Sequence, residues 1–164
     1  MISISTLEGK VAFVTGSTRG IGWETAQFLA QQGAIVLLNG ISDKELLQSR
    51  IQEIQKIQHE CDGFLCGIAD RTEVKKCYDQ MFKKFKRLDI LVNNAGSQPG
   101  RDRVLLVDLE EDAFDEVMRV NVKGTYLCSR AVATHMVGRG GGGKIIIISS
   151  GAGKRGRARF AAYC

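Results

Sequence analysis

Short apolar runs alternate along the chain with longer segments in which apolar residues recur every three or four positions. The runs are continuous rather than alternating, which is typical of strands buried on both faces of a parallel sheet. They are Val11–Thr15, Ala34–Leu38, Phe64–Ile68, Ile90–Asn93 and Ile145–Ile148. The last run is four consecutive isoleucines, and its β-branched residues predict a strand covered on both faces.

Helical periodicity occupies the segments between these runs. We expect helices over Ile21–Gln32, after Asp43, after Asp70 and over the long stretch Glu110–Met136. Asp43 and Asp70 are placed to cap their helices, and Glu73 completes a capping-box pattern with Asp70. Strands separated by helices of this length fold as right-handed βαβ units. The pattern therefore predicts an α/β protein with a parallel sheet and helices on both faces.

Length and composition describe one globular domain. The chain has 164 residues, of which 44% are hydrophobic and 25% charged, and this is enough to bury a sizeable core. No repeat or linker divides it, so residues 1–164 are predicted to form a single domain. No stretch approaches the roughly 18 consecutive apolar residues of a membrane span. The first ten residues lack the apolar run of a secretory signal.

Positive charge gathers toward the end of the chain. The net charge is +5, and residues 138–164 contain no acidic residue. The basic residues of this stretch are Arg139, Lys144, Lys154, Arg155, Arg157 and Arg159. A basic tract binds nucleic acid or another acidic ligand, or is simply a solvated loop. We expect no nucleic-acid partner, and a salt-dependent DNA-binding assay would distinguish these readings.

Cysteine and histidine are arranged unfavourably for metal sites and disulfides. The five cysteines include no CxxC pair, and the only histidines are His59 and His135. This pattern favours reduced thiols in a cytoplasmic protein and predicts no metal site. His135 lies among apolar residues and is expected to pack against a helix.

The strongest local signal is the glycine-rich segment Thr15–Gly22, between the first predicted strand and the first predicted helix. Its spacing is GxxxGxG. Glycines permit a tight turn and a close approach of the backbone to phosphate, and the N–H groups of a helix N-terminus attract anions. The segment is thus a candidate pyrophosphate site, with a ligand-free glycine turn as the alternative.

A second glycine-rich segment, Gly138–Lys144, has the spacing of a P-loop. However, Ile145 occupies the position of the magnesium-binding Ser or Thr, and the segment precedes a strand instead of following one. We interpret it as a surface connection. The segment Ser97–Asp108 lacks periodicity and is expected to be a surface loop near the ligand edge.

Three further motifs follow the glycine segment in order: Asn93–Gly96 at the end of the fourth strand, Asn121 in the long helix, and Ser150 with Tyr163 thirteen residues later. Together with Thr15–Gly22 they resemble the short-chain dehydrogenase/reductase family, over Leu7–Cys164. The resemblance implies a Rossmann-type, doubly wound parallel sheet that is incomplete at its C-terminal end. It also implies a homo-oligomer for a full-length form.

The resemblance assigns chemistry to named residues. Tyr163 would be the general acid/base, Ser150 would hydrogen-bond the substrate oxygen, and Asn121 would hold a water in a proton relay. The residues implied to contact the cofactor phosphates are Gly16, Ser17, Thr18, Arg19, Gly20, Ile21 and Gly22. Those implied to lie along the rest of the cofactor are Ile68, Asn94, Ala95 and Gly96. The structural alternatives are a strand-end hydrogen bonder for Ser150 and a helix-bend stabiliser for Asn121.

The cofactor implied is a nicotinamide dinucleotide. Selectivity for NAD usually needs an acid at the end of the second strand, and Leu38–Ile41 contains none. Arg19 resembles the basic residue of NADP-preferring members, so NADP is favoured, with NAD as the alternative. An Asp that often contacts the adenine is replaced here by Gly67.

The implied activity is the interconversion of a carbonyl and a secondary alcohol. Among family members the sequence is nearest to 3-oxoacyl-(acyl-carrier-protein) reductases, so the substrate expected is a small-molecule or acyl-carrier-linked carbonyl or alcohol. The lysine of the family's YxxxK motif would fall at position 167, and the sequence ends at Cys164. An inactive dinucleotide-binding fragment is therefore the alternative.

Overall fold

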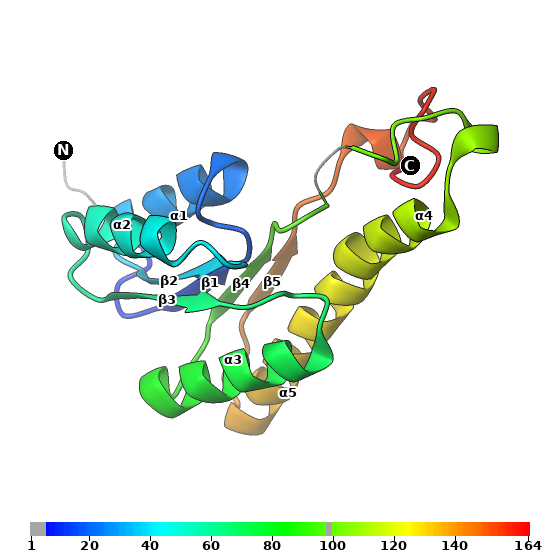
Figure 1. Ribbon diagram of the computed structural model, residues 1–164. Coiled ribbons are helices and arrows are strands. Elements are labelled where there is room, and N and C mark those ends of the chain that lie inside the picture. Colours follow the sequence, from blue (N-terminus) through cyan, green and yellow to red (C-terminus); the bar gives the residue numbers. More distant parts are fainter. Residues whose placement is uncertain (1–5, 98–99) are drawn as a thin grey trace.

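The computed structural model describes residues 6–97 and 100–164, and its centre is a five-stranded parallel sheet (Figure 1). The strand order is β3-β2-β1-β4-β5, so β1 and β4 lie side by side where the order reverses. The strands are β1 (Val11–Val14), β2 (Ile35–Gly40), β3 (Cys61–Leu65), β4 (Ile90–Asn93) and β5 (Lys144–Ile147). Ligands of open α/β sheets bind at such a reversal, beyond the carboxyl ends of the strands.

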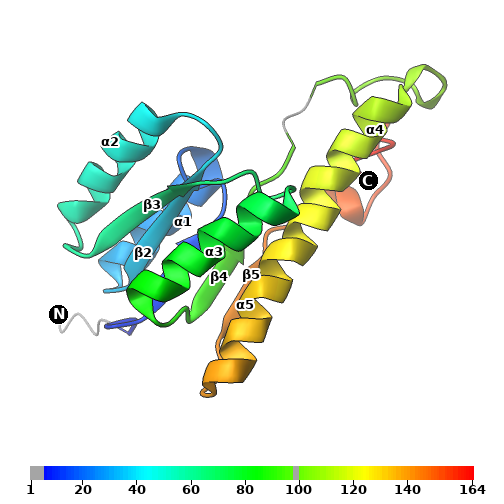
Figure 2. The same cartoon turned by 60° about the horizontal axis from the view of Figure 1, so that its bottom comes forward.

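Helices cover both faces of the sheet. Figures 1 and 2 show α1 and α2 on one face and α3 and α5 on the other. The helices are α1 (Gly20–Gln31), α2 (Lys44–Gln55), α3 (Arg71–Phe85), α4 (Glu111–Val117) and α5 (Thr125–Arg139). This confirms the predicted Rossmann-type, doubly wound α/β fold. None of the helices in the described part of the chain combines the length and apolar character needed to cross a membrane.

Two apolar clusters, one on each face of the sheet, form the core. Consecutive strand residues point to opposite faces, so Phe13 packs with Leu91 and Tyr78 of α3, while Val14 packs with Trp23 of α1. β1, β2 and β4 are buried at nearly every position and therefore need mostly apolar residues. This requirement explains the continuous apolar runs in the sequence.

Two strands differ from the sequence predictions. β3 covers Cys61–Leu65, not Phe64–Ile68, because the chain leaves the sheet after Cys66 donates its N–H to the Gly40 carbonyl. β5 pairs with β4 alone at the sheet edge, and Ile145–Ile148 are 38–58% exposed. The prediction that this strand is covered on both faces is wrong for the described structure.

The helix caps largely follow the sequence. Asp43 Oδ1 accepts from Leu46 N at 2.9 Å, and Asp70 Oδ1 accepts from the N–H groups of Thr72 and Glu73. The reciprocal half of the capping box does not form, because the Glu73 carboxylate accepts from Gly67 N at 2.6 Å instead of from Asp70 N.

The predicted helix Glu110–Met136 is not uniform. The α-helical segments α4 and α5 are joined by a π-helical segment, η2 (Met118–Gly124). Upstream of α4, the predicted loop Ser97–Asp108 contains one short 3₁₀ turn, η1 (Leu106–Asp108); residues 98 and 99 of that loop lie outside the described residues.

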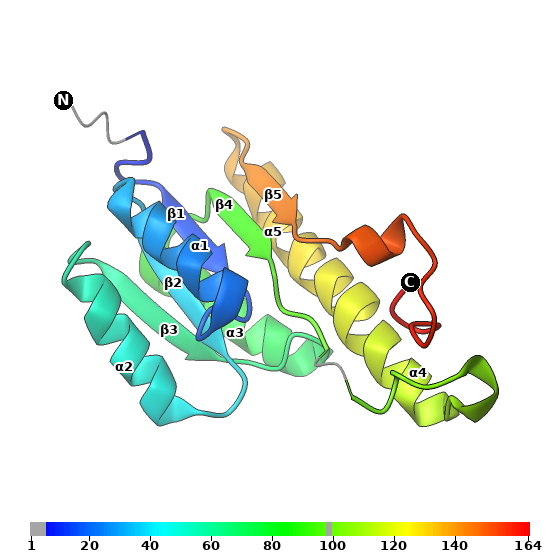
Figure 3. The ribbon, with the colours of Figure 1, turned by 90° about the horizontal axis from the view of Figure 1, so that it is seen from above.

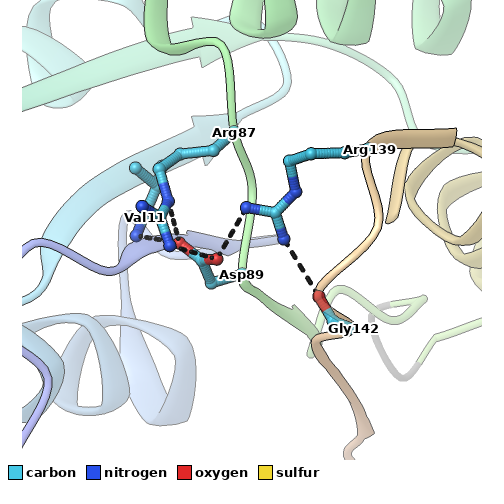
Figure 4. A network of polar contacts seen from close by, with 5 residues as sticks. All are labelled: Val11, Arg87, Asp89, Arg139 and Gly142. Carbon is cyan, nitrogen blue, oxygen red and sulfur yellow. Dashed lines mark hydrogen bonds and ion pairs between the residues drawn. The ribbon is translucent and has the colours of Figure 1, made fainter. Parts of the chain in front are cut away.

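An ion network joins three segments at the amino ends of β1 and β4 (Figure 4). The Asp89 carboxylate accepts from the guanidinium groups of Arg87 (2.8 and 2.9 Å) and Arg139 (3.0 Å), and from Val11 N (2.9 Å). Arg139, at the end of α5, also donates to the Gly142 carbonyl. The network fixes β1 against β4 and the glycine-rich turn before β5. Gly138–Lys144 is therefore a connection between α5 and β5, as predicted.

The hydrogen bonds of this network lower the pKa of Asp89. Burial alone would raise it, but the hydrogen bonds from Arg87, Val11 and Arg139 lower the pKa of Asp89 from its ordinary 3.8 to about 2. A carboxylate whose pKa is lowered on folding stabilises the fold above its unfolded pKa. That contribution is lost as the pH falls from about 4 toward 2.

We expect Asp89→Asn to lower the free energy of unfolding by about 2 kcal/mol at neutral pH, since each pKa unit corresponds to ~1.4 kcal/mol. The matched control is Asp79→Asn, which removes an exposed i,i+4 ion pair with Lys75 and should cost below ~0.5 kcal/mol. The measurement is urea denaturation between pH 2 and 7. Equal stability of the Asp89 variant and the parent protein at pH 7 would contradict the network's role.

Candidate functional site

The segment Thr15–Gly22, named here the glycine loop, runs from the carboxyl end of β1 into α1. Gly16 and Gly20 have positive φ values of 63° and 56°, a region that favours glycine. A Cβ on Gly16 would lie 2.9 Å from the Ala95 Cα, and one on Gly22 would collide with the Asn94 side chain and the Gly16 carbonyl. The loop therefore requires glycine both for its turns and for its close packing on the end of β4.

Asn39, near the end of β2, anchors the glycine loop. Its Oδ1 accepts from Gly16 N at 3.0 Å, and its own N–H donates to Ser17 Oγ at 2.9 Å. Its Nδ2 lies within hydrogen-bond distance of the carbonyls of Gly40, Phe64 and Cys66. Asn39 is buried, so each of these bonds satisfies a polar group that water does not reach.

Thr15 and Asn94 join the loop to the end of β4. Thr15 Oγ1 accepts from Asn94 N at 2.9 Å and from Ala95 N at 3.0 Å, and it donates to the Val92 carbonyl. The Asn94 side-chain amide donates to the carbonyls of Thr15 and Gly16. Asn94 and Ala95, predicted as cofactor contacts, therefore also hold the glycine loop in place.

The N-terminus of α1 faces outward from this frame. Arg19, Gly20 and Ile21 are exposed, while Ser17, Thr18 and Gly22 are buried. Arg19 is the N-cap residue and its side chain makes no capping hydrogen bond. The first-turn N–H groups carry the partial positive charge of the helix dipole, and no acidic residue occupies that turn to neutralise it. The arrangement suits an anionic group such as a phosphate.

Arg50 of α2 supports the same loop from the other side. Its Nε donates to the Thr18 carbonyl at 3.0 Å, and its guanidinium lies 4.5 Å from the centroid of the Trp23 ring. Its Nη1 also pairs with Glu53 at 2.9 Å. Sequence analysis did not identify this role, because Arg50 is an ordinary polar position in an amphipathic helix.

Ile68 and Asn121 each lie close to a glycine. Ile68 is buried, and a Cβ on Gly124 of η2 would come within 2.7 Å of its Cδ1. Asn121, in the middle of η2, accepts from Ser97 N at 2.8 Å through Oδ1, while its carbonyl accepts from Thr125 Oγ1. A Cβ on Gly96 would lie 3.3 Å from the Asn121 Oδ1. The π-helical segment thus holds Asn121 against the chain that leaves β4, a placement recurrent at functional sites.

Ser150 ends the extended segment after β5 and begins a 3₁₀ turn, η3 (Gly151–Gly153). Its Oγ accepts from Ala152 N at 3.1 Å. This contact uses the hydroxyl as an acceptor and leaves its O–H to donate elsewhere. Ser150 is therefore both a strand-end hydrogen bonder, as the structural alternative held, and a free donor.

Two cavities share Tyr163. The first cavity, of about 630 Å³, is open and is lined by Ser150 and Tyr163 together with Arg103, Arg157, Ala158, Arg159 and Phe160. The second, of about 320 Å³, is lined by Asn121 and Tyr163 with residues of α4 and η2. Figure 3 shows the segment after β5 returning to lie beside α4. Ser150, Tyr163 and Asn121 are thereby gathered around two adjacent hollows.

The structure connects the two parts of the candidate site through the chain that follows β4. Asn94 and Ala95 contact Thr15 of the glycine loop, and Ser97 contacts Asn121. The described contacts do not join Ser150 or Tyr163 directly to the glycine loop. Residues 94–97 therefore link the glycine loop, at one end, to Asn121 and the second cavity at the other.

The remaining residues considered for metal or disulfide chemistry are His135 and the cysteines. His135 stacks on Phe82 with ring centroids 3.9 Å apart, and burial lowers its pKa; it packs against a helix as predicted. All five cysteines are free thiols. Within residues 6–97 and 100–164, no cluster of three or more His, Cys, Asp or Glu side chains is arranged to hold a metal ion.

The fold and the site define a doubly wound α/β protein with an anion-binding turn at the reversal of its strand order. The sequence model of the family described as short chain dehydrogenase matches residues 10–164. The chain therefore belongs to the short chain dehydrogenase family.

Individual relatives differ in what their names describe. The chain is 38% identical over 144 residues to 3-oxoacyl-(acyl-carrier-protein) reductase FabG of Thermotoga maritima, covering 88% of this chain and 56% of that protein. A metagenomic short-chain oxidoreductase in complex with NADP is 36% identical, with a TM-score of 0.88, covering 96% of this chain and 70% of that one. NAD⁺-bound xylitol dehydrogenase is 30% identical, with a TM-score of 0.89, covering 96% of this chain and 59% of that one. The chain spans 56–62% of the length of the curated relatives it matches.

The close packing of the glycine loop can be tested by making the same Gly→Ala substitution at a crowded position and at an open one. Gly22→Ala should lower the free energy of unfolding by about 1–3 kcal/mol, because the new methyl group has no space between Asn94 and the Gly16 carbonyl. Gly138→Ala, in α5, meets no atom within 4 Å and should gain up to ~1 kcal/mol from helix propensity. Urea denaturation measures both; equal effects at the two positions would contradict the packing described.

Proposed function

We propose that the protein is an NADP(H)-dependent oxidoreductase that interconverts a carbonyl and a secondary alcohol. The observation that carries the proposal is the shared cavity of Ser150 and Tyr163, with Asn121 in the adjoining one. A hydroxyl donor and a phenol facing one space form the pair needed to polarise a carbonyl oxygen and exchange a proton with it. Family membership supports the same chemistry.

The residues present fit a dinucleotide. The exposed N-terminus of α1 and the backbone of Gly16–Gly22 would hold its phosphates, because a Cβ at Gly20 would meet no atom within 4 Å and no acidic residue occupies the first turn of α1. Ile68 and Asn94–Gly96 would lie along the rest of the molecule. When bound, the nicotinamide ring supplies or accepts the hydride.

The chain's own residues would orient and protonate the substrate. Ser150 would donate a hydrogen bond from its hydroxyl to the substrate oxygen, since the bond that it accepts from Ala152 N leaves its O–H free to donate. Tyr163 would give its phenolic proton to that oxygen in reduction and take it back in oxidation. Asn121, whose side chain is held by Ser97, would bind a water molecule in the second cavity. That water would pass protons to and from Tyr163, which lines the same cavity.

The finer parts of the proposal concern substrate, assembly and location. The FabG relative supports a 3-oxoacyl group, free or linked to an acyl carrier, as the first substrate to test. Xylitol dehydrogenase supports sugar alcohols as the second. A homo-oligomer and a cytoplasmic location, the latter supported by the five free thiols, complete the proposal.

We expect NADP to bind more tightly than NAD. The end of β2 offers no carboxylate to repel a 2′-phosphate, and Arg19 is exposed at the α1 N-terminus with no described ion pair. Arg19→Ala should weaken NADP binding about tenfold, equivalent to ~1.4 kcal/mol, and leave NAD binding unchanged. Calorimetric titration of the protein expressed from its complete coding sequence, with Arg71→Ala as the surface-charge control, measures this. Tenfold tighter binding of NAD would overturn the assignment.

We expect Tyr163→Phe and Ser150→Ala each to lower kcat at least ~100-fold while dinucleotide affinity stays within a factor of two, since acid/base assistance is worth about 10²–10⁴. The Phe variant keeps the ring contact with Phe160 and removes only the phenolic oxygen. NADPH oxidation with 3-oxoacyl esters gives kcat. Full activity in the Tyr163 variant would refute the proposed proton transfer.

A further inference from the structure

Arginine and aromatic side chains are stacked along one wall of the first cavity. The Arg103 guanidinium contacts two rings, 3.8 Å from the centroid of Phe160 and 4.4 Å from that of Tyr163. The Arg157 guanidinium lies 4.5 Å from the Phe160 ring. Stacking restrains a flat guanidinium while the N–H groups at its edge stay available to oxygen acceptors. The wall is therefore ordered before any ligand arrives.

The positive charge of this wall is only partly neutralised. Arg103 lies 3.1 Å from the Asp102 carboxylate and its side chain is 18% exposed. Arg157 and Arg159 are exposed, and in the part of the chain that the structure describes neither forms an ion pair. No acidic residue lines the cavity. Two uncompensated cations thus share a hollow with Ser150 and Tyr163.

We propose that the substrate carries an anionic oxyacid group, carboxylate or phosphate, which Arg157 and Arg159 bind while its carbonyl or hydroxyl lies at Ser150 and Tyr163. This inference rests on the proposed function and deepens it. Guanidinium groups bind both kinds of oxyanion through paired N–H···O bonds. Arg103 is a positioning residue that holds the Phe160 and Tyr163 rings.

The position of the charge favours a small anion over an acidic protein or nucleic acid. Lys154 and Arg155 belong to the same basic segment but do not line the cavity, whereas Arg157 and Arg159 do. A macromolecular partner would use the whole segment, including its outward-facing members. A small oxyacid needs only the cations that face the cavity.

The test compares pairs of ketones in which one member carries the anionic group and the other is neutral. The pairs are 4-oxopentanoate with its methyl ester, for a carboxylate, and hydroxyacetone phosphate with hydroxyacetone, for a phosphate. With the complete protein and NADPH, we expect kcat/KM to be at least about tenfold higher for the anion in one of the two pairs, through a lower KM. The preference should shrink at high salt, because exposed charges are screened. The responding pair identifies the oxyacid.

Two variants locate the effect. Arg157→Gln combined with Arg159→Gln should remove the preference, and kcat/KM should fall less for the neutral ketone than for the anion. Arg155→Gln removes the same charge from the same segment outside the cavity and should change neither. The Lys pair, Arg157→Lys with Arg159→Lys, should keep part of the preference. Equal loss of the anion preference in the cavity variant and in the Arg155 control would overturn the inference. So would a loss of kcat/KM that is confined to an acyl-carrier-linked substrate.

Binding measurements separate this inference from the proposed reaction. Calorimetry with NADP-loaded protein measures the affinity of each oxyacid directly. If no ketone is reduced but an oxyacid binds through Arg157 and Arg159, the proposed reaction fails and the anion site stands. If neutral ketones are reduced and neither oxyacid is bound or preferred, the reaction stands and the anion site is refuted.

Discussion

The constraint on which the site depends is a set of hydrogen bonds: those that Asn39 and Asn94 make to the glycine loop, and those that Thr15 of the loop makes to the end of β4. A loop with glycines at three of its positions has many accessible conformations. Here its Gly16 N–H, Gly16 carbonyl and Thr15 carbonyl each have one side-chain partner from β2 or the end of β4. Because these partners are buried or half-buried, another loop conformation would leave them unpaired at a cost of about 1–3 kcal/mol each. The α1 N-terminus is consequently presented in one orientation.

The sheet supplies the frame for that constraint. β1 and β4 are adjacent because the strand order reverses there, and they are held at both ends. Asp89 joins their amino ends to α5 through Arg139, and Thr15 joins their carboxyl ends. The segment that follows β4 contacts Asn121 through Ser97, and the segment that follows β5 contains Ser150. The anion-binding turn is therefore positioned by β1 and β4, and the Ser150–Tyr163 cavity by the chain that follows β5, which pairs with β4.

Much of the fold could be predicted because its signals are local. Continuous apolar runs, the Asp43 and Asp70 caps and the glycine spacing each depend on neighbouring residues. The exposure of Ile145–Ile148 in the described residues could not be predicted, since a continuous apolar run does not say which strands have neighbours on both sides. Asn39 and Arg50 were missed because their partners lie on other elements. The Arg103 contact with Tyr163 joins distant segments and has no sequence pattern.

The central claim is that the glycine loop and the Ser150–Tyr163 cavity belong to one active site in which the dinucleotide and the oxidisable or reducible substrate meet. Amide hydrogen exchange of the complete protein tests it most directly, with NADPH and with NADPH plus a bound oxyacid. We predict that NADPH protects residues 16–22 and 94–97, and that the oxyacid adds protection at residues 150–163 only when the dinucleotide is present. Protection of residues 150–163 that is independent of the dinucleotide, or no protection of the glycine loop, would contradict the account.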